Sequence, residues 1–255
     1  MLDIAQSHNV TLVLSLWNGA LLRDEFECAV FRDDAALNAF IEHALAPLAI
    51  KLRAHPALAM WEIVNEPEGM LNLDVVPSGI GNPCTDLKPL LQCAGPHNQP
   101  GWNRREGSNC SVSMQRLQRF VNRQAAALKS FDGSHLVTVG AWSHCSVSAA
   151  AEGFSYFSDA CLRLAGGEDA GTLDVWQLHS YPDKAAPWRF GEAEPVNKPA
   201  SFYVTNPKLR KPVLIGEVSN RWDTLPDPTA AKVKYSTSIG DTSSNTSSTA
   251  AAAAA

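Results

Sequence analysis

The chain has 255 residues, of which 45% are hydrophobic and 18% charged. This is the composition of an ordinary globular protein, with enough residues for one large domain or two small ones. The net charge of −5 is small, so neither a nucleic-acid partner nor a polybasic membrane patch is expected. No apolar run approaches the roughly 20 residues of a membrane span, and we expect no membrane partner.

Five short apolar segments in the chain have the composition of strands that are buried on both faces. They are residues 10–17, 57–65, 135–142, 173–181 and 212–218. Residues 33–53 and 113–129 carry apolar residues at helical spacing. Pro47 is expected to kink or divide the first helix, and Ser111 or Ser113 to cap the second. This alternation predicts a parallel sheet with helical crossovers, either a barrel or a doubly wound sheet.

Two regions interrupt the alternation. Residues 69–109 are rich in Gly, Pro, Asn and Cys, and we interpret them as a long, ordered loop. Residues 226–255 end in a low-complexity stretch of Ser and Thr followed by Ala. Such a segment cannot build a hydrophobic core, so we predict a disordered tail. The folded domain is therefore expected within residues 1–225.

The six cysteines are widely spaced and form no CxxC pair, so a zinc site is not expected. Together with three glycosylation sequons, at Asn9, Asn109 and Asn245, they favour disulfide bonds and a secreted protein. Six cysteines allow 15 pairings, and the sequence does not choose among them. The first residues lack the pattern of a signal peptide.

Four of the five predicted strands end on residues that suit a polar pocket. These residues are Trp17 and Asn18, Asn65 and Glu66, His179 to Tyr181, and Gly216 and Glu217. A single glutamate after a strand is ordinarily solvated. The carboxyl ends of parallel strands share one rim, however, so these side chains are expected to converge there.

Two carboxylates across a small site suit glycoside hydrolysis, in which one protonates the leaving oxygen and the other attacks the anomeric carbon. In a retaining enzyme they lie about 5–5.5 Å apart. His179 and Tyr181 could hydrogen-bond the attacking carboxylate, and Asn65 could hold a sugar hydroxyl. Tryptophan rings suit the apolar faces of pyranose rings, which makes Trp17 and Trp142 candidate subsite walls.

The motifs "NEP", "HSY" and "IGE" at these strand ends resemble those of clan A glycoside hydrolases. The segments "LSLWN", "MWEIVNEPEG", "LQRFVNRQAAALK" and "LVTVGAW" are similar to family 5 endo-β-1,4-mannanases, particularly the animal, mollusc-like branch. The resemblance implies a (β/α)8 TIM barrel with Glu66 as the acid/base, on the fourth strand, and Glu217 as the nucleophile, on the seventh. It also implies that Asn65, His179, Tyr181, Trp17 and Trp142 bind substrate.

Counted against that family, strands 3–7 are present, whereas strands 1, 2 and 8 are missing. We therefore interpret residues 1–225 as a partial catalytic domain, an incomplete barrel from a longer secreted protein. Glu68 is expected to be a solvated or salt-bridged neighbour of the pair. Glu62 could be buried and paired, and no chemistry is assigned to it.

The expected partner is a β-1,4-linked mannan or glucomannan, cleaved at internal linkages by a monomeric enzyme without metal or cofactor. Two alternatives remain open. One is a β-1,4-glucanase of the same family, and the other is an inactive fragment that at most binds carbohydrate.

Overall fold

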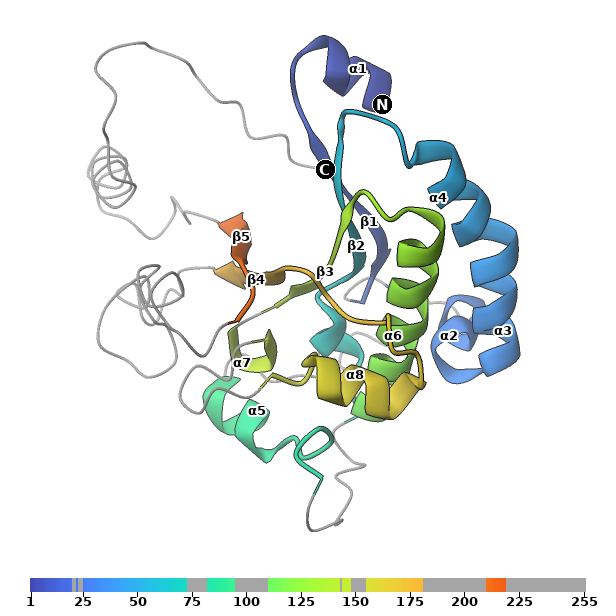
Figure 1. Cartoon of the computed structure of the whole chain (residues 1–255). Helices are drawn as coiled ribbons and strands as arrows, with labels where there is room; N and C mark the ends of the chain where they lie inside the picture. Colours follow the sequence, from blue (N-terminus) through green and yellow to red (C-terminus); the bar gives the residue numbers. More distant parts are fainter. Residues whose placement is uncertain are drawn as a thin grey trace, which may run out of the picture.

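The computed structural model describes residues 1–19, 22, 25–72, 82–94, 110–142, 144–147, 155–180 and 210–218 (Figure 1). Its centre is a sheet of five parallel strands in the order β1-β2-β3-β4-β5. The strands are β1 (Leu12–Asn18), β2 (Leu58–Asn65), β3 (Leu136–Ala141), β4 (Trp176–Ser180) and β5 (Val213–Val218). All five predicted strands are confirmed. Because the spatial order follows the chain without reversal, the sheet is wound as in a barrel and not as in a doubly wound fold.

Helices precede and connect the strands, and α3, α4, α6 and α8 lie together on one side of the sheet (Figure 1). The helical segments are α1 (Leu2–Ser7), α2 (Glu25–Arg32), α3 (Asp34–Phe40), η1 (Ile41–Leu45), α4 (Ala46–Leu52), η2 (Pro67–Met70), α5 (Lys88–Ala94), α6 (Met114–Phe131), α7 (His144–Val147) and α8 (Asp159–Gly166). Of the two predicted helices, the second begins as expected, since Ser113 Oγ accepts a hydrogen bond from the backbone of Arg116.

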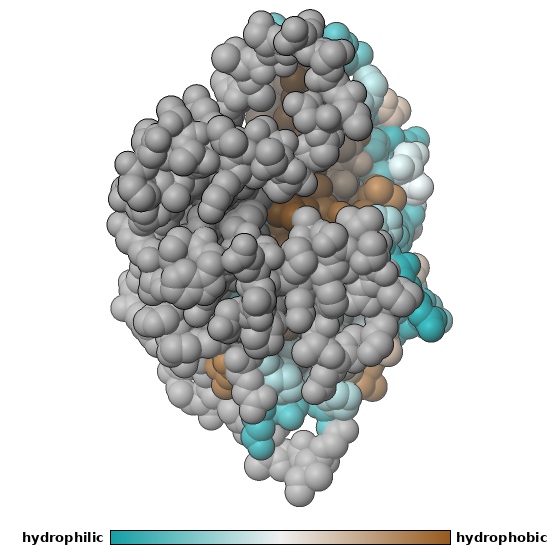
Figure 2. Space-filling view, turned by 90° about the vertical axis from the view of Figure 1, so that its left-hand side faces the viewer, coloured by the Kyte–Doolittle hydropathy of each residue, from teal (hydrophilic) through white to brown (hydrophobic). Residues whose placement is uncertain are grey.

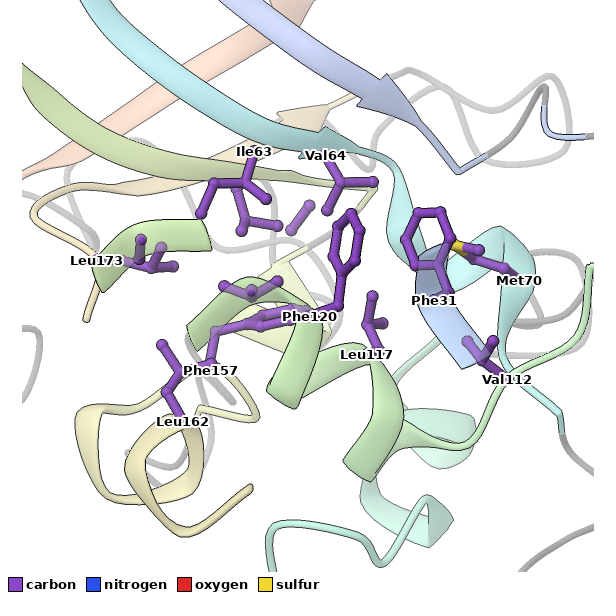
Figure 3. Packing of buried hydrophobic residues seen from close by; sticks show 14 of the residues in the cluster. Phe31, Ile63, Val64, Met70, Val112, Leu117, Phe120, Phe157, Leu162 and Leu173 are labelled. Carbon is purple, nitrogen blue, oxygen red and sulfur yellow. The ribbon is translucent and has the colours of Figure 1, made fainter. Parts of the chain in front are cut away.

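Helix α6 supplies the centre of the hydrophobic core. Its Leu117 and Phe120 lie beneath Ile63 and Val64 of β2, and Phe31 of α2 lies beside them (Figure 3). The rings of Phe31 and Phe120 stack with their centroids 3.9 Å apart. The apolar stripe that predicted this helix is therefore the face that attaches the helix layer to the sheet.

The helix predicted at residues 33–53 is a continuous helical stretch, Asp34–Leu52, with the π-type segment η1 in its middle. Asp33 caps it by accepting a hydrogen bond from the backbone of Ala35. The π segment ends just before Pro47, which lies in the first turn of α4, so the helix continues through the proline with a π-type segment on its N-terminal side and is not divided there.

By length and composition alone, Asp34–Leu52 could also cross a membrane, and it is the one such helix among the described residues. Its buried Leu37, Leu45 and Ala49 belong to the hydrophobic core. Its η1 and α4 segments contact helix α6, whereas Leu48 and Ile50 of the same stretch are exposed.

Two disulfides tie the loops to the helices. Cys28 of α2 is bonded to Cys110, and Cys84 is bonded to Cys161 of α8. Cys145 of α7 is disulfide-bonded as well. The prediction of disulfides is confirmed, and the segment before α6 is pinned at Cys84 and Cys110 by partners that lie 77 and 82 residues away in sequence.

Candidate active site

Side chains from three strands meet at the carboxyl edge of the sheet. His179 Nδ1 lies 3.0 Å from Glu66 Oε1 and 3.7 Å from Glu217 Oε1. One ligand atom from each of the three groups lies within 4.8 Å of the other two. His179 is almost fully buried, whereas both carboxylates reach solvent. The structure thus brings three of the predicted site residues together, with the two carboxylates accessible and the imidazole behind them.

Glu66 is presented by an unusual backbone. Its φ of 47° and ψ of 52° are in the left-handed region, which a glutamate rarely adopts and which costs of order 1–3 kcal/mol. The pairing of β2 with β3 also shifts register between Glu62 and Asn65, as in a β-bulge. The Glu66 N–H donates to the carbonyl of Gly140, 2.6 Å away, which holds this turn against β3.

The end of β1 supports the same turn. The Gly19 N–H donates to the Asn65 carbonyl at 2.7 Å. A Cβ on Gly19 would lie 2.8 Å from Pro67 Cα and 2.9 Å from the Glu66 carbonyl oxygen. Only a glycine allows the two backbones to approach this closely.

The surroundings of Glu217 and His179 shift the pKa values of both groups. Partial burial, together with the charges of Glu66 and Glu62, raises the pKa of Glu217, and the positive charge of His179 opposes this rise. Burial lowers the pKa of His179, but the hydrogen bond to Glu66 and the charges of Glu217, Glu66 and Glu62 outweigh it and raise the pKa. A cationic imidazole between carboxylates is therefore favoured here.

Glu68 is not the solvated neighbour that the sequence analysis expects. Its side chain is buried, at 2% exposure, and it accepts hydrogen bonds from the backbone of Trp142, at 3.0 Å, and from Ser146 Oγ. Burial raises its pKa, and the two hydrogen bonds oppose this rise in part. Glu68 thus ties the turn after β2 to the loop after β3, and sequence reasoning missed this function because its partners follow more than 70 residues later.

Trp17 does not join the carboxylates. Its ring packs edge-on against Phe31, Phe40 and Phe120, and its Nε1 donates to Gln124 of α6 at 3.3 Å. These partners lie in the helix layer, and Trp17 is partly buried against the hydrophobic core. Its role as the wall of a sugar subsite stays a prediction.

The other predicted site residues lie near the pair or outside the described part of the chain. Asn65, half-buried, directly precedes Glu66 and pairs with Asn18 of β1 and Gly140 of β3. Trp142, also half-buried, follows the end of β3, and Glu68 holds its backbone. Tyr181 lies outside the described residues.

Glu66, His179 and Glu217 could also bind a metal ion. Among the described residues, this is the one cluster of three or more potential metal ligands. Acidic groups commonly gather without an ion.

The sequence and the fold both match known enzymes. No model of a known protein family matches the chain. It is 36% identical over 220 residues to a mannan endo-1,4-beta-mannosidase of Mytilus edulis, covering 85% of this chain and 54% of that protein. It is 33% identical to a protein of the same name from Cryptopygus antarcticus, over 86% of this chain and 52% of that protein.

Solved structures agree with these matches. The β-1,4-mannanase of the sea hare Aplysia kurodai superposes with a TM-score of 0.71 at 31% identity, covering 92% of this chain and 61% of that one. The β-mannanase of Mytilus edulis superposes with a TM-score of 0.69 at 35% identity, covering 86% of this chain and 57% of that one. The chain spans about half the length of the curated relatives it matches.

By fold and sequence, then, the chain is a partial (β/α) barrel that is homologous to glycoside hydrolases. More narrowly, it is a homologue of the mannan endo-1,4-β-mannosidases over most of its length, which confirms the resemblance to family 5 mannanases.

Proposed function

We propose that the chain carries the catalytic pair of a retaining hydrolase that cleaves internal β-1,4-mannosidic linkages, with Glu66 as acid/base and Glu217 as nucleophile. The observation that carries the proposal is the meeting of the two carboxylates within 4.8 Å at the carboxyl edge of the sheet. Inverting enzymes separate their carboxyl groups by about 6.5–9.5 Å, because a water must fit between the second carboxylate and the sugar. The shorter spacing here supports the retaining mechanism.

In the proposed reaction, Glu66 donates its proton to the glycosidic oxygen as a Glu217 oxygen forms a bond to the anomeric carbon. Glu66 then takes a proton from water, which displaces Glu217 from the glycosyl intermediate. Like charges at this distance disfavour two ionised carboxylates, so a single shared proton leaves one acid and one base. The positive charge of His179 lowers the pKa of Glu217, against the rise that burial causes, and so favours the ionised nucleophile.

His179 would orient the pair. Its Nδ1 faces both carboxylates, and its burial fixes the ring. Asn65 and Trp142 lie beside the acid/base turn and are proposed to contact the sugar, as is Tyr181 two residues after His179. Mannan is favoured over a β-1,4-glucan as the substrate because every relative reported above is named a mannanase or mannosidase.

The disulfides support a further part of the proposal, that the protein acts outside the cell. Two bridges and a fifth bonded cysteine, Cys145, require an oxidising compartment to form and persist. We propose that it acts there as a monomer on extracellular polysaccharide.

The test is release of reducing ends from β-1,4-mannan by the purified 255-residue chain, with carboxymethyl-cellulose as the competing substrate. Glu66→Ala and Glu217→Ala should each lower the rate by a factor of at least ~1,000, whereas Glu42→Ala, an exposed glutamate of η1, should leave it unchanged. Cleavage of cellulose alone would support the glucanase alternative. A chain that cleaves neither substrate would support the inactive remnant.

A further inference from the structure

A second polar pair lies in the interior of the sheet, one level below the catalytic pair. Glu62 of β2 accepts a hydrogen bond from Gln177 Nε2 of β4, and both side chains are buried, at 5% and 3% exposure. Neither residue belongs to the hydrophobic core on the helix side. The proposed mechanism uses neither of them.

Glycines on the two neighbouring strands make room for this pair. A Cβ on Gly140 of β3 would lie 2.8 Å from Glu62 Oε2 and 2.9 Å from Gln177 Nε2, so the hydrogen bond passes directly over this residue. A Cβ on Gly216 of β5 would lie 2.8 Å from the Gln177 amide. The pair thus connects β2 with β4 and packs on β3 and β5, which fixes four strands at one level.

The same four strands hold the catalytic groups at the next level. The carbonyl of Gly140 accepts from the Glu66 N–H, His179 lies two residues after Gln177, and Glu217 follows Gly216 directly. Any movement of Glu62 or Gln177 is therefore transmitted to the turn or strand that carries each carboxylate.

Stability alone does not explain the pair. A buried carboxylate costs desolvation energy, and buried polar pairs are often replaceable by apolar residues without loss of stability. Among the described residues, no group donates to Gln177 Oε1, which leaves a buried acceptor unsatisfied. Such exceptions are found where a site needs a polar group for function.

The negative charge of Glu62 also acts on His179 and Glu217 of the catalytic site. With Glu66 and Glu217 it is one of three carboxylates whose negative charge raises the pKa of His179. These three are the titratable groups that act on the imidazole from β2 and β5. The effect supports a role for Glu62 at the site.

We infer that Glu62, hydrogen-bonded to Gln177 over Gly140, is a positioning residue that sets the distance between Glu66, His179 and Glu217. The inference rests on the proposed function. Supporting layers of this kind hold catalytic side chains within about 0.5 Å of their productive geometry.

The test measures covalent trapping of Glu217 by 2-deoxy-2-fluoro-β-mannobiosyl fluoride. An oxygen of Glu217 bonds to C1 while the C1–F bond breaks, and fluoride leaves with the electron pair, so no proton from Glu66 is needed. Intact mass and peptide mapping give the site, and the dependence of the rate on probe concentration separates the limiting rate from the affinity. If the wild-type protein is not labelled at Glu217, the proposed function is refuted, and the inference falls with it.

With wild type labelled, Glu62→Ala should lower the limiting rate by roughly tenfold or more, with little change in probe affinity. Gln177→Glu should lower it at least as much, because two carboxylates would face each other over Gly140. Combining Glu62→Gln with Gln177→Glu restores one carboxylate and one amide, and should recover most of the rate.

Gln118→Glu is the matched control. Gln118 is a buried glutamine of α6 that donates to the carbonyls of Cys84 and Tyr156, far from the pair in the helix layer. Its substitution should lower thermal stability and leave the limiting rate unchanged. The inference is overturned if Glu62→Ala labels at the wild-type rate, or if the double exchange fails to recover the rate while its thermal stability matches wild type.

Discussion

Replacing Gly19 with alanine would push directly on the backbone that carries Glu66. The new Cβ would lie 2.8 Å from Pro67 Cα, and ordinary contact begins at 3.4 Å, so the two backbones must separate by about 0.6 Å. The neighbouring atoms are main-chain atoms and cannot rotate away. Because a misplacement of about 1 Å can lower catalysis 100-fold, we expect roughly a tenfold loss in the rate of mannan cleavage.

Overpacking should also lower the free energy of unfolding by about 1–3 kcal/mol, measured by urea denaturation. Gly133→Ala is the matched control, because its Cβ would meet only the Lys129 carbonyl oxygen, at 3.8 Å. It should leave the cleavage rate unchanged and the stability equal or slightly higher. Equal cleavage rates for Gly19→Ala and Gly133→Ala would refute the claim that Gly19 places the acid/base turn.

Three further predictions concern buried polar groups. Burial raises the pKa of Glu68, so the folded state binds the proton of this group more tightly than the unfolded state. Glu68→Gln should therefore raise the free energy of unfolding at pH 7, as measured by urea denaturation. This gain should disappear below about pH 4, where the carboxyl is protonated in both states. Asp132 is buried, but hydrogen bonds from Trp61 and His135 lower its pKa, so its contribution to the free energy of unfolding is present above about pH 4 and lost in more acidic solution. Asp132→Asn should lower the free energy of unfolding by about 2 kcal/mol at pH 7 and make it depend less on pH below about pH 4. Trp17→Phe removes the hydrogen bond to Gln124 and one ring of the indole, so it should lower the free energy of unfolding by at least about 1 kcal/mol and leave the KM for mannan unchanged; a raised KM would support the subsite wall.

Strand order and helix positions follow from patterns that the sequence displays locally. The continuous apolar segments gave all five strands within three residues of their bounds, since a strand buried on both faces needs apolar residues throughout. Ser113 was identifiable as a cap by its place before an amphipathic stripe. The short helices α2, α5 and α8 were missed, because fewer than three turns give little periodicity to detect.

The surroundings of side chains at the site are harder to predict. Trp17 lies one residue before the end of β1, and the contacts of its ring with Phe31, Phe40 and Phe120 depend on the face that the pleat of the strand gives it. Glu68 looked solvated because the groups that permit its burial, the backbone of Trp142 and the Ser146 hydroxyl, are distant in sequence. The Gln177 partner of Glu62 lies 115 residues away, a separation that no local pattern predicts.

The most direct test of the carboxylate pair is the configuration of the first product. Proton NMR of the anomeric region, recorded within minutes of adding the chain to a short β-1,4-manno-oligosaccharide, distinguishes the two anomers before they equilibrate. Two carboxylates that meet within 4.8 Å predict a β-anomer that later converts to the equilibrium mixture. Initial release of the α-anomer, or no release of product at all, would contradict the account.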